Sequence, residues 1–254
     1  MNIEIEKGKK VYFASDQHLG APTKKESDVR EAKFLRWLDE IAADVDTLFL
    51  LGDLFDFWFE YKTVVPKGFV RTMAKLAQLK EQGVSIFFFV GNHDLWMNGY
   101  FEEELGIPVY HEPKVFTING KHFFLGHGDG LGPDDIGFKI MKKVFTNSFF
   151  QWMFKWIHPD IGVRFAQNLS TKNKMISGKD DFNFLGEDKE WLILYAKRKL
   201  EQRHYDHFVF GHRHLPTTYQ LNEKSLYTNL GDWCLFFTYA SFDGEQMMLE
   251  TYNN

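Results

Sequence analysis

The chain has 254 residues, of which 44% are hydrophobic and 26% are charged, and it carries a net charge of −5. A chain of this length can bury the core of one large domain, with or without an insertion. Its single cysteine, Cys234, excludes a disulfide framework. No apolar run reaches signal-peptide length or the roughly 18 residues of a membrane span, so a cytoplasmic protein is expected.

Short apolar runs alternate with amphipathic stretches through the first 90 residues. The runs are rich in Phe and Val and end at Gly, Asp or His, which favours buried strands at Lys10–Ser15, Thr47–Leu51, Ser85–Val90, His122–Leu125 and His207–Phe210. Asp28–Ala42 and Phe69–Glu81 carry apolar residues at helical spacing. A final meander or hairpin is predicted from Ser225–Leu230, Leu235–Ser241 and Gln246–Tyr252. The alternation predicts a layered α/β fold.

Residues 131–186 interrupt this rhythm. Lys139–Ile157 is apolar nearly all round at helical period and predicts one long aromatic helix. Residues 137–179 contain eight Lys or Arg and one acid, a charge of +7 inside an otherwise acidic chain. We expect a helical lid insertion at 131–186, standing over a core formed by residues 1–130 and 187–254.

Five motifs with histidine or carboxylate residues follow the predicted strands. In chain order they are Asp16-Gln17-His18, Gly52-Asp53-Leu54-Phe55-Asp56, Gly91-Asn92-His93-Asp94, Gly126-His127-Gly128-Asp129 and Gly211-His212-Arg213-His214. One such motif alone is usually a turn or a cap, but five at successive strand ends predict a metal site. Carboxylate, imidazole and amide ligands suit Mn²⁺, Fe²⁺ or Zn²⁺. Two cations roughly 3.5–4 Å apart need a bridging ligand, and a carboxylate is the natural one.

The order of these motifs resembles that of the calcineurin-like metallophosphoesterases, and the resemblance spans residues 16–214. It implies a four-layer α/β/β/α sandwich with a dinuclear centre, most readily of Mn²⁺. It also implies that Asp16, His18, Asp53 and His214 hold one metal. By the same resemblance, Asp53 bridges to a second metal, which Asn92, His127 and His212 complete.

The resemblance places His93 beside the metals as a catalytic residue, with Asp94 orienting its ring. Asp56 and Asp129 are expected to fix ligand histidines. Two cations would attract an anionic phosphodiester or pyrophosphate and activate water for in-line attack. His93 would then hydrogen-bond the transition state or protonate the leaving group. A structural histidine in a tight turn is the alternative role.

The substrate is suggested by the stretch that opens the insertion. His127-Gly128-Asp129, Leu131, Asp134 and Asp135 resemble the H-G-D-x-L-x-x-D-D run of the UDP-2,3-diacylglucosamine hydrolases of the lipid A pathway. That family releases UMP and 2,3-diacylglucosamine 1-phosphate, and the resemblance implies substrate binding by Asp134, Arg164, Ser170 and Lys174. Where well-known members carry Arg, this chain has His93. A metallophosphodiesterase or pyrophosphatase acting on another nucleotide-linked or soluble phosphoester therefore stays open as the alternative.

Aromatic residues and lysines of the insertion suit acyl chains and an anionic membrane surface. We therefore expect a peripheral protein of the inner membrane whose partner is a nucleotide-linked glycolipid; an aromatic core between lid and body is the alternative. Nucleic acid is not expected as a partner, because the aromatics form blocks rather than alternating with basic residues. A metal-free scaffold is disfavoured because every ligand position is filled. The oligomeric state is left open.

Overall fold

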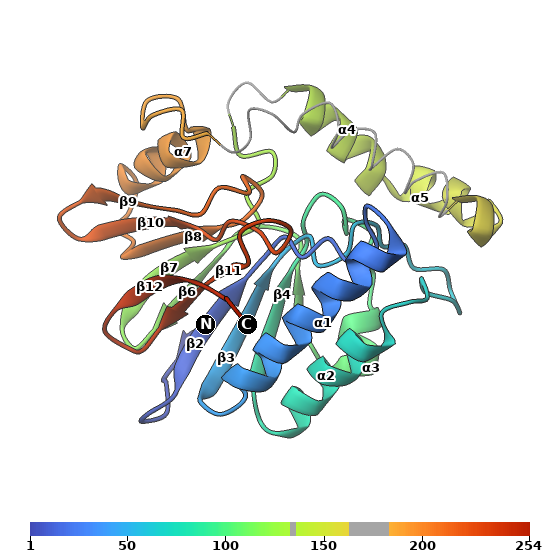
Figure 1. Ribbon diagram of the computed structural model, residues 1–254. Coiled ribbons are helices and arrows are strands. Elements are labelled where there is room, and N and C mark those ends of the chain that lie inside the picture. The colour runs from blue at the N-terminus through green and yellow to red at the C-terminus, as the bar shows by residue number, and fades with distance from the viewer. Residues whose placement is uncertain (133–135, 163–182) are drawn as a thin grey trace.

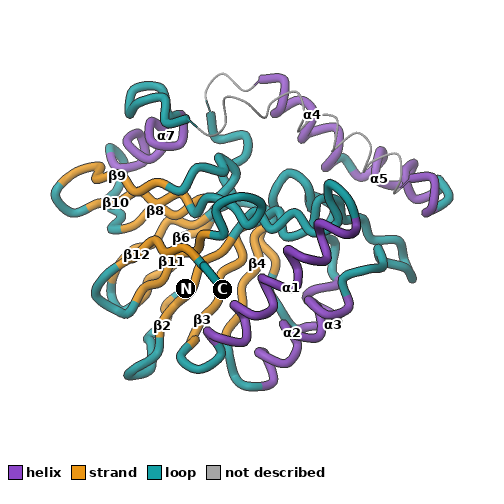
Figure 2. Tube along the Cα trace, in the orientation of Figure 1, coloured by secondary structure: helices purple, strands orange, loops and turns teal. Residues whose placement is uncertain are grey.

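The computed structural model describes residues 1–132, 136–162 and 183–254. Two six-stranded sheets lie face to face, and helices cover their outer faces (Figure 1). Figure 2 shows the same layers by element type, with loops gathered at the upper ends of the strands. The predicted four-layer α/β/β/α sandwich is confirmed.

The first sheet has the strand order β12-β11-β2-β3-β4-β5. Strands β2 to β5 run parallel, whereas β11 is antiparallel to both β2 and β12. Their bounds are β2 Lys10–Ala14, β3 Val45–Leu51, β4 Ser85–Phe89, β5 Val109–Tyr110, β11 Thr238–Phe242 and β12 Met247–Thr251.

The second sheet has the strand order β1-β6-β7-β8-β10-β9. Its pairs β7–β8 and β8–β10 are parallel, so the ends of β7 and β8 meet at one edge. The bounds are β1 Asn2–Ile3, β6 Lys114–Ile118, β7 Lys121–Leu125, β8 His207–Phe210, β9 Thr217–Asn222 and β10 Ser225–Asn229.

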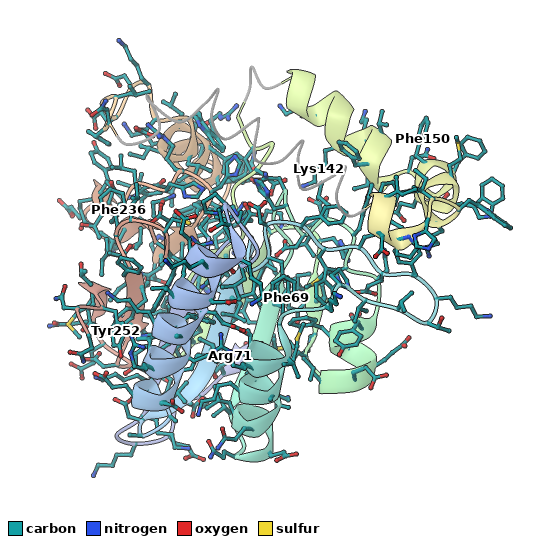
Figure 3. All side chains as sticks on the ribbon, turned by 45° about the vertical axis from the view of Figure 1, so that its right-hand side comes forward. Phe69, Arg71, Lys142, Phe150, Phe236 and Tyr252 are labelled. Atoms are coloured by element: carbon teal, nitrogen blue, oxygen red, sulfur yellow. The ribbon has the colours of Figure 1, made fainter. Side chains whose placement is uncertain are left out.

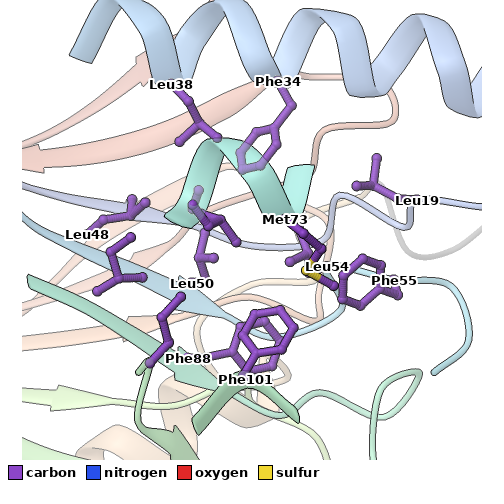
Figure 4. Close-up of a cluster of buried hydrophobic side chains, with 14 of the residues drawn as sticks. Leu19, Phe34, Leu38, Leu48, Leu50, Leu54, Phe55, Met73, Phe88 and Phe101 are labelled. Carbon is purple, nitrogen blue, oxygen red and sulfur yellow. The ribbon is translucent and has the colours of Figure 1, made fainter. Parts of the chain in front are cut away.

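Three apolar cores separate the four layers, because successive side chains of a strand point to opposite faces. Leu48 and Leu50 of β3 face α1 (Lys24–Ile41), α2 (Val70–Glu81) and α3 (Tyr100–Leu105), as Figure 4 shows for the labelled residues. Phe49 and Leu51 of the same strand pack between the sheets. Strand β8 divides in the same way, with Phe208 facing α7 (Trp191–Leu200) and Val209 facing the first sheet.

Two helices lie outside the four layers and pack on loops at the edge of the sandwich (Figure 1). They are α4 (Ile136–Thr146) and α5 (Ser148–Lys155), and together we call them the α4–α5 arm. The prediction of one helix over Lys139–Ile157 is wrong, because α4 ends before Asn147 and α5 begins after it. That side chain accepts a hydrogen bond from the Phe149 amide and so caps a new helix.

One predicted strand boundary is also wrong. The run Leu235–Ser241 was expected to be extended, but β11 begins only at Thr238. The Asp232 carboxylate accepts hydrogen bonds from the amides of Cys234, Leu235 and Phe236 and so folds this stretch into a turn. Among the helices that the structure describes, none combines the length and apolarity needed to span a bilayer.

Candidate metal centre

The five motifs meet at one edge of the sandwich, because each follows the carboxyl end of a central strand. The first three motifs follow the parallel strands β2, β3 and β4, and the last two follow β7 and β8. The structure therefore brings together the seven residues predicted as metal ligands: Asp16, His18, Asp53, Asn92, His127, His212 and His214.

The backbone of these loops is strained at the residues that carry the predicted ligands. Asp16, His18, Asp53, His212 and His214 all have positive φ, between 44° and 66°. A non-glycine residue in this region costs about 1–2 kcal/mol, so it persists only where the surroundings enforce it. In this backbone conformation, the five side chains point toward a common site.

Each of the two central carboxylates has one oxygen fixed and one directed into the site. Asp16 Oδ2 accepts from the His212 amide at 2.9 Å, and Asp53 Oδ1 accepts from the His93 amide at 2.9 Å. Asp16 Oδ1 is buried, and no hydrogen bond reaches it within the described part of the chain. A buried anionic oxygen without a donor is the kind of group that a cation satisfies.

Histidine nitrogens surround those oxygens. Nε2 of His18 and Nε2 of His214 lie 3.3 Å apart, and they are 3.6 and 3.4 Å from Asp16 Oδ1. Donor atoms about 2.1 Å from a shared cation lie roughly 3.0–3.5 Å from each other. This group of atoms therefore fits a divalent cation.

A second group lies beside the first and shares Asp53 with it. Asp53 Oδ2 is 3.6 Å from Nε2 of His18 and 3.4 Å from Nε2 of His127. Nε2 of His127 is in turn 3.2 Å from Asn92 Oδ1. The rings of His127 and His212 have their centroids 5.0 Å apart. One Asp53 oxygen thus faces both groups, as a bridging ligand must.

Hydrogen bonds fix the ring orientation of the histidines. Nδ1 of His127 lies 2.8 Å from the Leu51 carbonyl, and Nδ1 of His214 lies 3.0 Å from Asp232 Oδ2. A carbonyl oxygen can only accept, so His127 carries its proton on Nδ1, and the Asp232 carboxylate holds His214 in the same tautomer. In both rings Nε2 is therefore the nitrogen that would bind a cation, in exchange for any proton that it carries.

The electrostatics of the site agree with this donor set. Burial alone would raise the pKa of Asp16, but the nearby His214 and His18 rings hold it well below its usual range. The pKa of Asp53 is likewise held low against burial, mainly by the His127 ring. Burial opposes a charge on His127, yet the Asp53 carboxylate raises the pKa of that ring to about 10. Negative potential of this kind attracts cations.

The ring of His93 lies at the rim of the site. Its Nε2 is 4.0 Å from Asp53 Oδ2, and its Nδ1 is 2.9 Å from the Asp56 backbone carbonyl. Because that carbonyl only accepts, Nδ1 is protonated and Nε2 is the nitrogen that can exchange a proton with a bound molecule. The Asp56 carboxylate also lies 3.5 Å from Nδ1 of His18, close to one of the rings that it was expected to fix.

Two expected contacts are replaced by others. The Asp94 carboxylate accepts hydrogen bonds from the Leu54 and Gly91 amides, so it ties the second motif to the third instead of orienting His93. Burial and the charge of Asp53 raise the pKa of Asp94 to about 8. Asp129 pairs with Lys142 of the α4–α5 arm at 2.8 Å rather than with a ligand histidine.

Asp232, the partner of His214, is absent from the five motifs. A signal for it exists in the sequence, because Gly231-Asp232 follows the predicted strand Ser225–Leu230 just as the other motifs follow theirs. Asp134, Arg164, Ser170 and Lys174, predicted to bind substrate, lie outside the described residues.

Comparisons of the sequence with known proteins identify a family. A model of the family described as Calcineurin-like phosphoesterase matches residues 9–216, a span that includes all five motifs. UDP-2,3-diacylglucosamine hydrolase from Porphyromonas gingivalis W83 is 34% identical over 255 residues, covering 95% of this chain and 97% of that protein. Proteins of the same name from Actinobacillus succinogenes and Photorhabdus laumondii are 27% and 29% identical. They cover 88% and 87% of this chain and 92% and 90% of their own lengths.

Proposed function

The chain belongs to the calcineurin-like phosphoesterase family, and from that premise we propose that it hydrolyses the pyrophosphate bond of UDP-2,3-diacylglucosamine. The products would be UMP and 2,3-diacylglucosamine 1-phosphate. The observation that carries the proposal is the pair of donor groups that share Asp53, together with relatives of this name that span nearly the whole chain.

The donor set fits two divalent cations, for which Mn²⁺ is our choice. Asp16, His18, Asp53 and His214 would hold one cation, and Asp53, Asn92, His127 and His212 the other. When bound, the two cations supply the positive charge that neutralises phosphate oxygens and activates water. Asp232 and the Leu51 carbonyl keep the ligand rings of His214 and His127 in the tautomer this role requires.

His93 protonates the leaving group in this hydrolysis. Water adds to one phosphorus and releases a proton to solvent, the bridging P–O bond breaks, and the leaving phosphate takes the bridging oxygen; His93 regains its proton from solvent afterwards. In this proposal Nε2 of the His93 ring donates a proton to that oxygen, while the Asp56 carbonyl holds Nδ1.

The α4–α5 arm, part of the proposed lid insertion at 131–186, fits the lipid part of such a substrate. None of the residues Ser148–Lys155 is buried. Phe149, Trp152 and Trp156 expose 58%, 55% and 77% of their surface, and Phe150 lies at the outer part of the arm in Figure 3. Large apolar side chains that are exposed next to one another mark a binding site for another molecule. We propose that it contacts acyl chains and the lipid of the inner-membrane surface.

The arm is also connected to the metal loops. Lys142 of α4, labelled in Figure 3, lies 2.8 Å from the buried Asp129, two residues after the proposed ligand His127. Asp134, Arg164, Ser170 and Lys174 remain our proposed contacts to the glucosamine and its phosphate.

A comparison of three substrates tests the function. Purified protein with Mn²⁺ would be assayed against UDP-2,3-diacylglucosamine, UDP-glucosamine without acyl chains, and bis-p-nitrophenyl phosphate. We expect UMP release to be fastest from the acylated substrate. Equal rates with and without acyl chains would remove the lipid specificity but keep the phosphoesterase, whereas no turnover of any of the three would refute both.

A further inference from the structure

Arg30 is a buried cation that lies against the first metal loop. It projects from α1, is 8% exposed, and its Nη2 donates to the carbonyl oxygen of His18 at 2.5 Å and to that of Ala21. One turn earlier on the same face of α1, the Ser27 hydroxyl accepts from the Gly20 amide at 2.7 Å. Two side chains of one helix thus hold the backbone of residues 18–21.

This loop needs such support. Its ligand residues Asp16 and His18 have φ values of 59° and 44°, a conformation that L-residues rarely adopt. The residue whose carbonyl Arg30 binds also carries the ring of the site: Nε2 of His18 lies 3.6 Å from Asp16 Oδ1 and 3.6 Å from Asp53 Oδ2. A shift of the His18 backbone would therefore move this ring relative to both carboxylates.

The charge of Arg30 is used in an unusual way. A buried guanidinium ordinarily pairs with a carboxylate, because its desolvation is costly. In the described ranges of the chain, Arg30 forms no ion pair, and its Nε has no hydrogen-bond partner. The neighbouring Glu31 is bound to Arg71 and Thr72 instead. The guanidinium is thus committed to two backbone carbonyls of the ligand loop.

We propose that Arg30 is a positioning residue of the metal centre, which holds the left-handed loop so that His18 faces the cation. The inference rests on the proposed role of His18 as a ligand. Arg30 itself touches neither metal nor substrate. It acts through the His18 carbonyl, and no other part of the proposed function depends on it.

Titration of metal-free protein with Mn²⁺ alone, followed by electron paramagnetic resonance, tests this role. We expect Arg30→Met to weaken one of two Mn²⁺ sites by about 10- to 100-fold, the effect typical of lost support behind a ligand. Arg30→Lys keeps the charge, but its Nζ lies one bond closer to the helix than Nη2 of arginine and reaches the two carbonyls less well, so its loss should be intermediate. Arg71→Met is the matched control, since Arg71 also binds α1 but through Glu31.

The outcomes are separable. Thermal unfolding in chelator shows whether each variant is folded, and Arg30→Lys carries the test if Arg30→Met is not. Parent affinity for both Mn²⁺ ions in Arg30→Met and Arg30→Lys would overturn the positioning role and leave the proposed hydrolase intact. Failure of the parent protein itself to bind two Mn²⁺ ions would instead overturn the metal centre, and the role of Arg30 with it.

Discussion

At the scale of single residues, the motifs require glycine where the loops of the candidate metal centre approach one another closely. A Cβ at Gly52 would lie 2.6 Å from Nδ1 of His127, and one at Gly91 would lie 2.2 Å from Asp53 Oδ1. Neither position has space for a methyl group. The glycine before a ligand is therefore part of the site, although it contacts no metal.

Gly91→Ala should damage the site more than its small size suggests. The new methyl group would displace the Asp53 carboxylate, so we expect loss of Mn²⁺ binding and destabilisation of about 1–3 kcal/mol. Urea unfolding in chelator and Mn²⁺ titration measure the two effects. Gly132→Ala is the control, since its Cβ would meet Trp191 at an ordinary 3.4 Å. Equal Mn²⁺ binding by both variants would contradict the expectation.

His93→Ala should separate chemistry from metal binding. The ring is outside both donor groups, so two Mn²⁺ ions should still bind, while kcat falls by roughly 10²–10⁴-fold through loss of the proton donor. His204→Ala, which removes an exposed histidine, is the control and should turn over like the parent. Parent-like kcat in His93→Ala would assign the ring a purely structural role.

The residues that meet at the candidate metal centre could be predicted from sequence because their types, spacing and strand-end positions form one ordered set. Their supports could not. Asp232 and Arg30 act through contacts with His214 and with the loop after β2, and only the folded chain brings these groups together. The error at Asp94 has the same origin, because sequence adjacency to His93 says nothing about which way a carboxylate turns.

At the scale of elements, the α4–α5 arm has two different faces. Phe154 packs inward on Phe59 and Trp96, with ring centroids 4.6 and 4.8 Å away, and the Trp96 indole donates to the Phe145 carbonyl. Phe149, Trp152 and Trp156 are on the exposed surface. The aromatic sequence thus serves both as a core toward the body and as an outward apolar surface.

Removing the outward aromatics should weaken membrane binding and leave the fold intact. We expect the double variant Trp152→Ser/Trp156→Ser to bind phosphatidylglycerol-containing vesicles at least roughly tenfold more weakly, since each indole loses an apolar contact. Vesicle sedimentation measures the binding. The double variant Val29→Ser/Val70→Ser removes equally exposed apolar residues of α1 and α2 and should bind like the parent. Unchanged binding by the tryptophan variant would refute the membrane-facing arm.

Longer elements could be predicted and short ones could not. The central strands and α1 and α2 carry enough residues for a period to be recognised, whereas β1 and β5 have two residues each and α3 has six. The break at Asn147 escaped because the apolar residues on both sides continue at helical spacing. The cap at Asn147 and the packing of Phe154 on Trp96 are contacts of the folded chain that this spacing does not show.

At the scale of the whole molecule, stability should depend on His207, which is buried at the start of β8. Its ring stacks on Phe123 at a centroid distance of 4.5 Å and lies near Phe242. Burial, and to a smaller extent the charge of Lys121, lower the pKa of this ring to about 4. The unfolded chain binds a proton below pH about 6.5, and the folded chain does so only below about 4.

Because of this difference in proton binding, the free energy of unfolding falls as the pH is lowered. The stabilising contribution of the neutral ring is complete above pH about 6.5 and is lost between about 6.5 and 4, on the order of 3 kcal/mol in total. His207→Leu cannot bind this proton, so its free energy of unfolding should fall less steeply over that range. Urea unfolding at several pH values compares the two proteins. Parallel curves for parent and variant would contradict the assignment.

The pairing of β2 with β11 joins the beginning of the chain to its end. A ribosome synthesises residues 10–14 early but supplies their neighbour, residues 238–242, only when translation is almost complete. Until then β2 has an unpaired edge, and Asp232, which orients His214, is itself made only shortly before β11. We therefore expect metal loading to occur late in biosynthesis, since a nascent chain stalled before residue 232 lacks both the β2–β11 pairing and the partner of His214.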